Sequence, residues 1–226
     1  MNFSNFSPSF NNARTVDSMD NGRFYSKVMS WVAVSFLAAT IGAVLVGPLV
    51  PPALMMPLYI VAFVALLVAG FSRKAMQLSG IFAVTVPFIL GIILYPTLNY
   101  YVSTGAGGIV GMAAGGTAVI FGGMAVLGWT SKKNLDHLAP KLFFILLGLI
   151  AMSFLNAFIF KLSILSLIVS AAVIVIMALY TFIDIQRLKN RDPYDQIPAA
   201  HYALNLFLNI YNIFVSLLNI LGILRN

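Results

Sequence analysis

Polar side chains recur along one face of the last apolar segment of the chain. They follow one another at steps of four, four, three, four and three residues: His201, Asn205, Asn209, Asn212, Ser216 and Asn219. These steps keep side chains on one face of a helix, and hydrocarbon would penalise such a face, so it must lie against protein or water. We weigh two roles for it, the lining of an ion path and plain hydrogen bonding to neighbouring helices. Because the other faces of the segment are also apolar, we infer a central helix surrounded by the rest.

Asp184 is the only acid within or at the edge of an apolar segment. An ionisable residue at membrane depth is a functional candidate, here a titratable group at the mouth of an ion path. The alternative is an interfacial acid paired with Arg187 one turn later, which is worth about a few tenths of a kcal/mol. Arg73 follows the second apolar segment directly, where it either anchors the chain on the cytoplasmic side or turns inward as a counter-ion to Asp184.

Motifs of common hydrolases and nucleotide-binding proteins are absent from the chain. It contains no H-E-x-x-H, no G-x-S-x-G and no glycine-rich phosphate loop. His137 and His201 stand far apart without a carboxylate array, and cysteine is absent, so a zinc site is unsupported. An intramembrane protease would need a nucleophile with its base or two aspartates, which Asp184 alone does not supply. We expect no enzymatic activity and no resident cofactor.

The composition predicts an all-α integral membrane protein. Of the 226 residues 61% are hydrophobic and 8% are charged, against about 25% charged in an average soluble protein, and the mean hydropathy is +0.97. These values exclude a soluble enzyme, a disulfide-stapled secreted module and a disordered chain. No segment has the alternating pattern of an outer-membrane barrel strand. The lipid bilayer is therefore the expected partner.

Seven charge-free stretches have about the 20 residues that a membrane-spanning helix needs. They cover residues 28–46, 53–71, 75–98, 107–129, 142–160, 162–183 and 203–224. The sequence thus predicts a seven-helix transmembrane domain over residues 28–226. Residues 1–27 are polar and are expected to form a disordered cytoplasmic tail.

Basic residues predict the orientation of these helices. Thirteen Lys and Arg stand against six acids, all of them aspartate, for a net charge of +7. Eleven of them fall on one side of the predicted membrane: Arg14, Arg23, Lys27, Arg73, Lys74, Lys132, Lys133, Lys141, Arg187, Lys189 and Arg191. Only Lys161 and Arg225 fall on the other side. Because short cytoplasmic loops are rich in Lys and Arg, we expect a cytoplasmic N-terminus and an outside C-terminus, and no binding of nucleic acid.

A glycine strip marks the fourth apolar segment. Gly107, Gly111 and Gly115 recur at every fourth residue, and Gly123 lies on the same face. Small residues in this pattern let another helix approach closely. We expect the strip to pack against a helix of the same chain, within a monomer; dimerisation is the alternative.

Three motifs together resemble those of a known family. They are the segment from Leu49 to Pro57, the segment from Tyr180 to Gln186, and Ile197-Pro198 followed by the segment from Ala203 to Asn212. The chain resembles the Bax inhibitor-1 family, also called the transmembrane BAX-inhibitor-motif family, and especially its bacterial calcium-leak members. The resemblance implies two three-helix layers around a central seventh helix.

The resemblance also implies a pH-sensitive passive leak of Ca²⁺. In this family two aspartates, on the sixth and seventh helices, gate the leak, and an arginine at the end of the second helix pairs with the first of them. Asp184 matches the sixth-helix aspartate and would contact Ca²⁺ in passing, and Arg73 matches the arginine. Asn209 stands where the family's sensor has its second aspartate. Two close carboxylates share a proton because both do not ionise easily, whereas an Asp–Asn pair has no such repulsion, so pH sensing is expected to be weakened or altered.

A regulatory role without transport is the rival function. Bacterial relatives in the family include modulators of a membrane-bound protease, and eukaryotic ones suppress cell death through partners. A continuous water-accessible path to the polar face of the last helix would favour transport, and complete occlusion would favour the regulator. The short loops and the bacterial resemblance favour the bacterial plasma membrane.

Overall fold

The chain folds into a bundle of helices. The structure, a computed structural model, describes residues 8–71, 77–192 and 196–225. Within these ranges there is no strand, and the longer helices are α1 (Pro8–Ile41), α2 (Met55–Phe71), α4 (Ser79–Ser103), α5 (Gly107–Thr130), α6 (Ala139–Leu155), α7 (Ser163–Lys189) and α8 (Ala199–Arg225). Short π or 3₁₀ turns extend α1 over Gly42–Val46 and Gly47–Leu49, precede α2 at Pro52–Leu54, and flank α6 at Asp136–Leu138 and Asn156–Phe160.

Six of the described helices are long and apolar enough to cross a membrane. They correspond to the first and the third to seventh predicted segments, and each overlaps its predicted segment but differs from it by up to seven residues at one end. The second predicted segment forms a shorter apolar helix over Pro52–Val68. Large apolar side chains such as Val44, Val119 and Phe144 point outward and are exposed, as expected for a bundle that lies in lipid. The prediction of an all-α integral membrane protein is confirmed.

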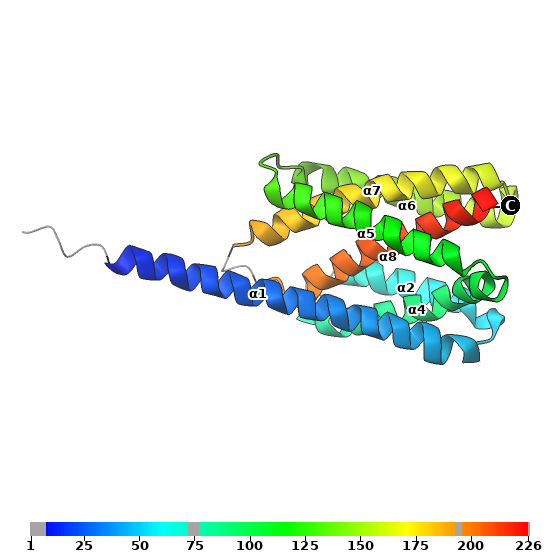
Figure 1. The fold of residues 1–226 in the computed structure, drawn as a ribbon, viewed down its shortest axis with the longest axis horizontal. Coiled ribbons are helices and arrows are strands. Elements are labelled where there is room, and N and C mark those ends of the chain that lie inside the picture. The colour runs from blue at the N-terminus through cyan, green and yellow to red at the C-terminus, as the bar shows by residue number, and fades with distance from the viewer. Residues whose placement is uncertain (1–7, 72–76, 193–195, 226) are drawn as a thin grey trace, which may run out of the picture.

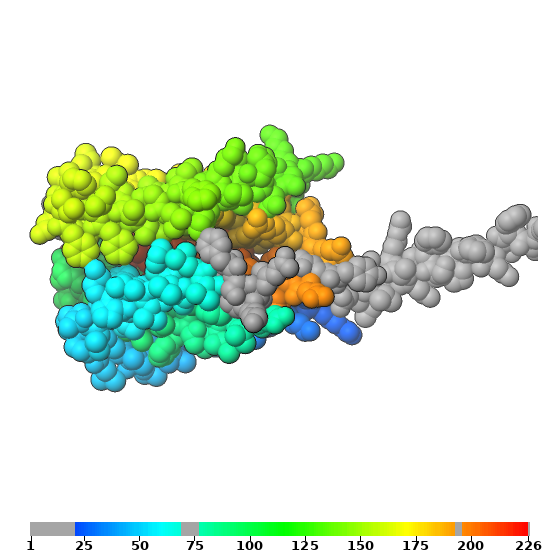
Figure 2. Space-filling model, turned by 180° about the vertical axis from the view of Figure 1, so that it is seen from behind, coloured from blue at the N-terminus to red at the C-terminus, as the bar shows by residue number. Residues whose placement is uncertain are grey.

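Helix α8 lies in the middle of the bundle. It contacts α1, α4, α5 and α7, while α2 packs on α4 and α6 packs on α7. In Figure 1 helices α1, α2 and α4 lie on one side of α8, and α5, α6 and α7 lie on the other. The space-filling view from behind shows the surface hollowed between these two groups (Figure 2). Among the described helices, α7 and α8 form the most extensive helix–helix contact. These two helices carry Asp184 and Asn209.

Close backbone approach fixes α1 against α4. A Cβ atom on Gly91 would collide with the backbone of Ala39, and one on Gly42 would collide with the carbonyl of Phe88. Pro87 has no N–H group and so leaves the carbonyl of Ala83 without its helical donor. The Ser35 hydroxyl of α1 donates to that carbonyl over 2.7 Å. The helix contact thus satisfies the group that the proline frees.

We expect Gly91→Ala to destabilise the bundle. The added methyl group would meet the Ala39 backbone, which moves only if α1 and α4 separate, and overpacking of this kind costs about 1–3 kcal/mol. The melting temperature in detergent should fall by about 2–10 °C. Gly111→Ala is the matched control, because nothing lies within 4 Å of that position. Equal melting temperatures for the two variants would contradict the proposed tight contact.

The glycine strip of α5 does not pack as predicted. Nothing in the described part of the chain lies within 4 Å of a Cβ atom placed on Gly107, Gly111, Gly115 or Gly123. Helix α5 instead buries the face that carries Ile109, Ala113 and Thr117, and the first two of these pack with Leu218 of α8. The prediction that the strip packs against a helix of the same chain is therefore wrong for the described residues. Both the glycines and the residues Ile109, Ala113 and Thr117 repeat at every fourth position, so the spacing alone does not indicate which of the two faces is buried.

The first membrane helix starts earlier than predicted. Its apolar span covers Asn21–Leu49, so the expected boundary at residue 27 falls inside α1. Phe24 and Tyr25 make edge-to-face ring contacts with Tyr202 and Trp129, with centroid distances of 5.8 Å and 5.6 Å. Residues 1–7 of the expected tail lie outside the described residues.

Candidate functional site between α7 and α8

Asp184 and Asn209 form a buried pair between α7 and α8. The Asn209 Nδ2 group donates to Asp184 Oδ2 over 2.7 Å, and the two residues are 6% and 5% exposed. Ile183 and Thr181 beside them are almost completely buried. A hydrogen bond to an ionised carboxylate is shorter and stronger than one between neutral groups. The amide therefore stabilises a carboxylate that water does not reach freely.

Arg187 supplies the positive charge next to this pair. Its Nη1 atom lies 3.7 Å from Asp184 Oδ1, while its Nε atom lies 2.6 Å from Asp136 Oδ1. The Arg187 and Asp136 side chains are 43% and 53% exposed, in contrast to Asp184. One cation thus stands between a buried and an exposed carboxylate and holds the exposed one more closely. The pair of Asp184 with Arg187, weighed as an alternative above, is present, but at a long distance.

The last turns of α7 also hold the connection between α5 and α6. Gln186 Nε2 donates to the Lys133 carbonyl over 2.7 Å, and Lys189 Nζ donates to the Trp129 carbonyl over 2.6 Å. A Cβ atom on Gly128 would meet the Phe182 backbone carbonyl at 2.6 Å, so the glycine lets α5 approach α7. This connection carries Asp136 and presents it to Arg187.

Arg73, the predicted partner of Asp184, lies outside the described residues. Among the described side chains Arg187 makes the ion pair with Asp184. Sequence reasoning did not find Asp136, because it lies 51 residues from Arg187 in the chain. A charged residue at the end of α7 and one in the α5–α6 connection carry no pairing signal of their own in a single sequence.

The polar face of α8 points partly to α7. Besides Asn209, the amide of Asn219 donates to Ser170 Oγ of α7 over 2.8 Å, whereas Asn212 donates to the Leu208 carbonyl of its own helix. Ser216 is buried, and His201 and Asn205 are half-buried. Two members of the face therefore bond a neighbouring helix, as the structural alternative predicts.

Access to the pair is restricted in this arrangement. Asp184 and Asn209 are 6% and 5% exposed, and neither lines the pocket at the end of α8 or the pocket beside Trp129. No cluster of three or more His, Asp or Glu side chains occurs among the described residues. Asp184 with one amide partner thus offers a cation few ligands, which suits brief contact better than tight binding.

Fold and site together define an all-helical integral membrane protein with a carboxylate buried between its last two helices. A family model described as Inhibitor of apoptosis-promoting Bax1 matches residues 21–226, and the chain belongs to this family. The resemblance drawn from the motifs is confirmed at the level of the family.

Bacterial relatives agree with this assignment. The chain is 32% identical over 195 residues to the Modulator of FtsH protease YccA of Escherichia coli, covering 84% of each protein. It is 30% identical over 223 residues to the uncharacterized protein Cj0236c of Campylobacter jejuni, covering 95% of this chain and 93% of that protein. It is also 32% identical over 114 residues to the inner membrane protein YbhL of Escherichia coli, covering 47% and 48%.

Proposed function

We propose that the protein is a passive Ca²⁺ leak of the bacterial inner membrane, seen here in a closed arrangement. The observation that carries the proposal is the carboxylate of Asp184, buried between two spanning helices and held by an amide at 2.7 Å. Burying a charge in a membrane protein is expensive, and such residues are usually retained for function. A hard cation such as Ca²⁺ prefers oxygen ligands, which Asp184 and the amide oxygen of Asn209 would supply in passing.

Opening of the path would require two movements, the release of the Asn209 amide from Asp184 and the withdrawal of Arg187 from it. In the closed arrangement Asn209 occupies Oδ2 of Asp184, and Arg187 stands near Oδ1. Withdrawal of Arg187 toward Asp136, which it already binds, would free the carboxylate for a cation. Arg73 is proposed as a second closing partner.

The outer half of the path would be closed by apolar packing. Toward the other end of α8, Leu218 packs with Tyr101, Ile109 and Ala113 in a buried cluster, and an apolar constriction of this kind excludes water and ions. In the open state we propose that the remaining polar residues of α8 line the path: His201, Asn205, Asn212, Ser216 and Asn219.

Calcium flux in proteoliposomes tests this function. The purified chain should collapse a steep Ca²⁺ gradient faster than empty liposomes do, and Asp184→Ala should change the rate because it removes the buried carboxylate between α7 and α8. Absence of flux at every pH from acid to neutral would refute the leak. Neither catalysis nor a resident cofactor is part of the proposal, and the active unit is a monomer.

The proposed topology has seven spans, with α2 as the short second span. The N-terminus lies in the cytoplasm and the C-terminus outside, with three helices on each side of α8. Lys132→Cys and Arg225→Cys, introduced singly into this cysteine-free chain, should react differently with an impermeant thiol reagent applied to intact cells. Position 225 should be labelled and position 132 protected. The reverse pattern would refute the orientation.

Modulation of a membrane-bound protease is the second candidate function. The observation that favours it is the relative named Modulator of FtsH protease YccA, which aligns over 84% of this chain. The restricted access to Asp184 also fits a role without transport. Turnover of a membrane substrate by such a protease, measured with and without the chain, distinguishes the two: a regulator would change turnover and show no Ca²⁺ flux.

A further inference from the structure

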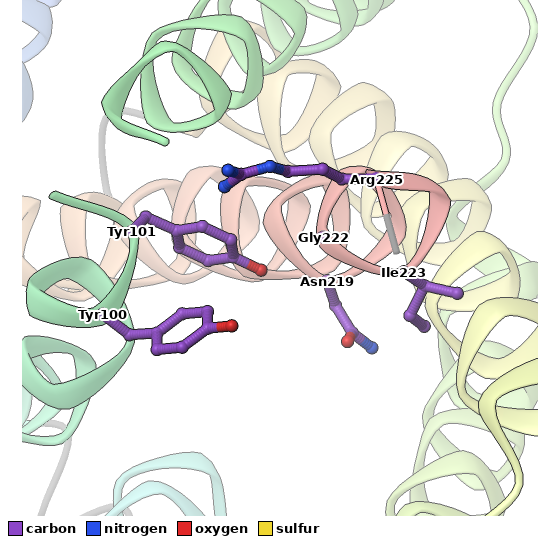
Figure 3. A pocket seen from close by; sticks show the side chains of 6 residues that line it. All are labelled: Tyr100, Tyr101, Asn219, Gly222, Ile223 and Arg225. Atoms are coloured by element: carbon purple, nitrogen blue, oxygen red, sulfur yellow. The ribbon is translucent and has the colours of Figure 1, made fainter. Parts of the chain in front are cut away.

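A polar pocket opens where α4 and α8 end, away from the pair of Asp184 on α7 and Asn209 on α8. It has a volume of about 210 Å³ and is lined by Tyr100, Tyr101, Asn219, Gly222, Ile223 and Arg225. Figure 3 shows the two tyrosine hydroxyls pointing from α4 toward α8, and Asn219 reaching from α8 into the same space. A water molecule takes up about 30 Å³, so the space holds a small polyatomic ligand with several waters.

The shape of this pocket depends on Gly222. A Cβ atom at that position would collide with the Tyr101 hydroxyl, which donates to the Leu218 carbonyl over 3.3 Å. The glycine thus lets Tyr101 reach the backbone of α8 and close one wall. Tyr101 is buried, whereas Tyr100 is 56% exposed, so the pocket has a fixed inner wall and an open side.

The lining offers hydrogen-bond donors and a positive charge. Arg225 carries five N–H donors, and its side chain runs back along α8 toward Tyr101 (Figure 3). Asn219 uses one amide hydrogen on Ser170 and keeps the other, while the Tyr100 hydroxyl adds another donor. None of the six described lining residues carries a carboxylate, so the guanidinium of Arg225 gives the described lining a positive charge that favours an anion.

The charged residues at this end of the bundle also favour an anionic ligand. The turns that join the helices here, residues 42–54, 104–106 and 156–162, contain no Asp or Glu. Their only charged residue is Lys161, and Arg225 makes no ion pair with any described residue at this end. A guanidinium beside tyrosine and amide donors matches the oxygens of a phosphate group.

We propose that this pocket binds a phosphate group, carried by an anionic lipid or free in solution. Its position at the helix ends is where headgroups lie, and tyrosines are enriched at this level of the membrane. The pocket lies away from the Asp184 pair. Tyr101 and Asn219 also belong to the proposed outer part of the ion path, but binding of a phosphate group is measured without Ca²⁺ flux.

The test is lipid binding by the full chain in neutral detergent. Native mass spectrometry should show phosphatidylglycerol retained by the parent, and Arg225→Gln should weaken this binding about tenfold or more, as loss of charge-assisted hydrogen bonds implies. Tyr100→Phe, at an exposed position, should weaken it by a smaller factor. Lys161→Gln removes the other positive charge at this end and is the matched control, so its binding should equal that of the parent.

A parallel measurement separates the two sources of phosphate. If inorganic phosphate raises the melting temperature of the parent but not of Arg225→Gln, the ligand is the free ion; if only phosphatidylglycerol does so, it is the lipid. Both results support the site. Equal retention of phosphatidylglycerol by the parent and Arg225→Gln, or an equal loss in Lys161→Gln, would overturn it.

Discussion

Arg187→Gln should increase the passive Ca²⁺ leak about fivefold. Arg187 is the described cation that pairs with the buried Asp184, 3.7 Å from its Oδ1 atom, so its loss leaves the carboxylate without a counter-charge in the closed arrangement. Removing one partner of a buried ion pair destabilises a protein more than removing one partner of an exposed pair. Because the Arg187 side chain is 43% exposed, we expect the closed arrangement to be destabilised by only about 1 kcal/mol. Initial rates of Ca²⁺ entry into proteoliposomes measure it.

Two further variants distinguish the loss of the counter-charge of Asp184 from a loosening of the α5–α6 connection. Lys189→Gln removes another basic residue of the same turn, which binds the Trp129 carbonyl and not Asp184, so its leak should equal that of the parent. Asp136→Asn frees Arg187 from its exposed partner and lets it approach Asp184, so the leak should be equal to or below that of the parent. If Lys189→Gln raises the leak as much as Arg187→Gln, loosening of the α5–α6 connection explains the effect instead.

Six described helices of this fold follow from the sequence because each is long and apolar. A charge-free run of sufficient length satisfies its backbone only as a helix in lipid, so the spans and their order could be predicted without a structure. The family motifs also placed Asp184 next to Asn209, although 25 residues separate them. The role of this pair as a gate stays a prediction.

The environment of Arg187 could not be predicted in the same way. Its bond to Asp136 depends on how the α5–α6 connection folds back over the end of α7, and no periodic pattern specifies that path. The glycine strip of α5 shows the opposite difficulty, since its period was clear but Ile109 and Ala113 repeat at the same spacing on another face. Periodicity indicates which residues share a face of a helix, and the neighbours that a face meets depend on the whole bundle.

Asn209→Asp should make the leak depend on pH. The substitution places a second carboxyl group where the amide now lies 2.7 Å from Asp184 Oδ2. Two carboxylates at this distance share one proton, because their repulsion opposes ionisation of both. A change in leak of about tenfold should therefore appear between about pH 6 and 8, where the parent, with one carboxyl group in the site, should vary far less.

Two controls make this prediction specific to the pair. Asn205→Asp adds a carboxyl group to the same face of α8, one turn away from Asn209. In the described structure the amide of Asn209, and not that of Asn205, donates to Asp184, so this variant should not reproduce the transition. The exchange variant Asp184→Asn/Asn209→Asp keeps one carboxyl group and one amide but swaps their helices. If coupling between two carboxyl groups creates the pH response, the exchange variant should resemble the parent. A transition of equal size in the exchange variant and in Asn209→Asp would place the response on α8 alone, with His201 as the next residue to replace, since the ordinary pKa of histidine is about 6.5.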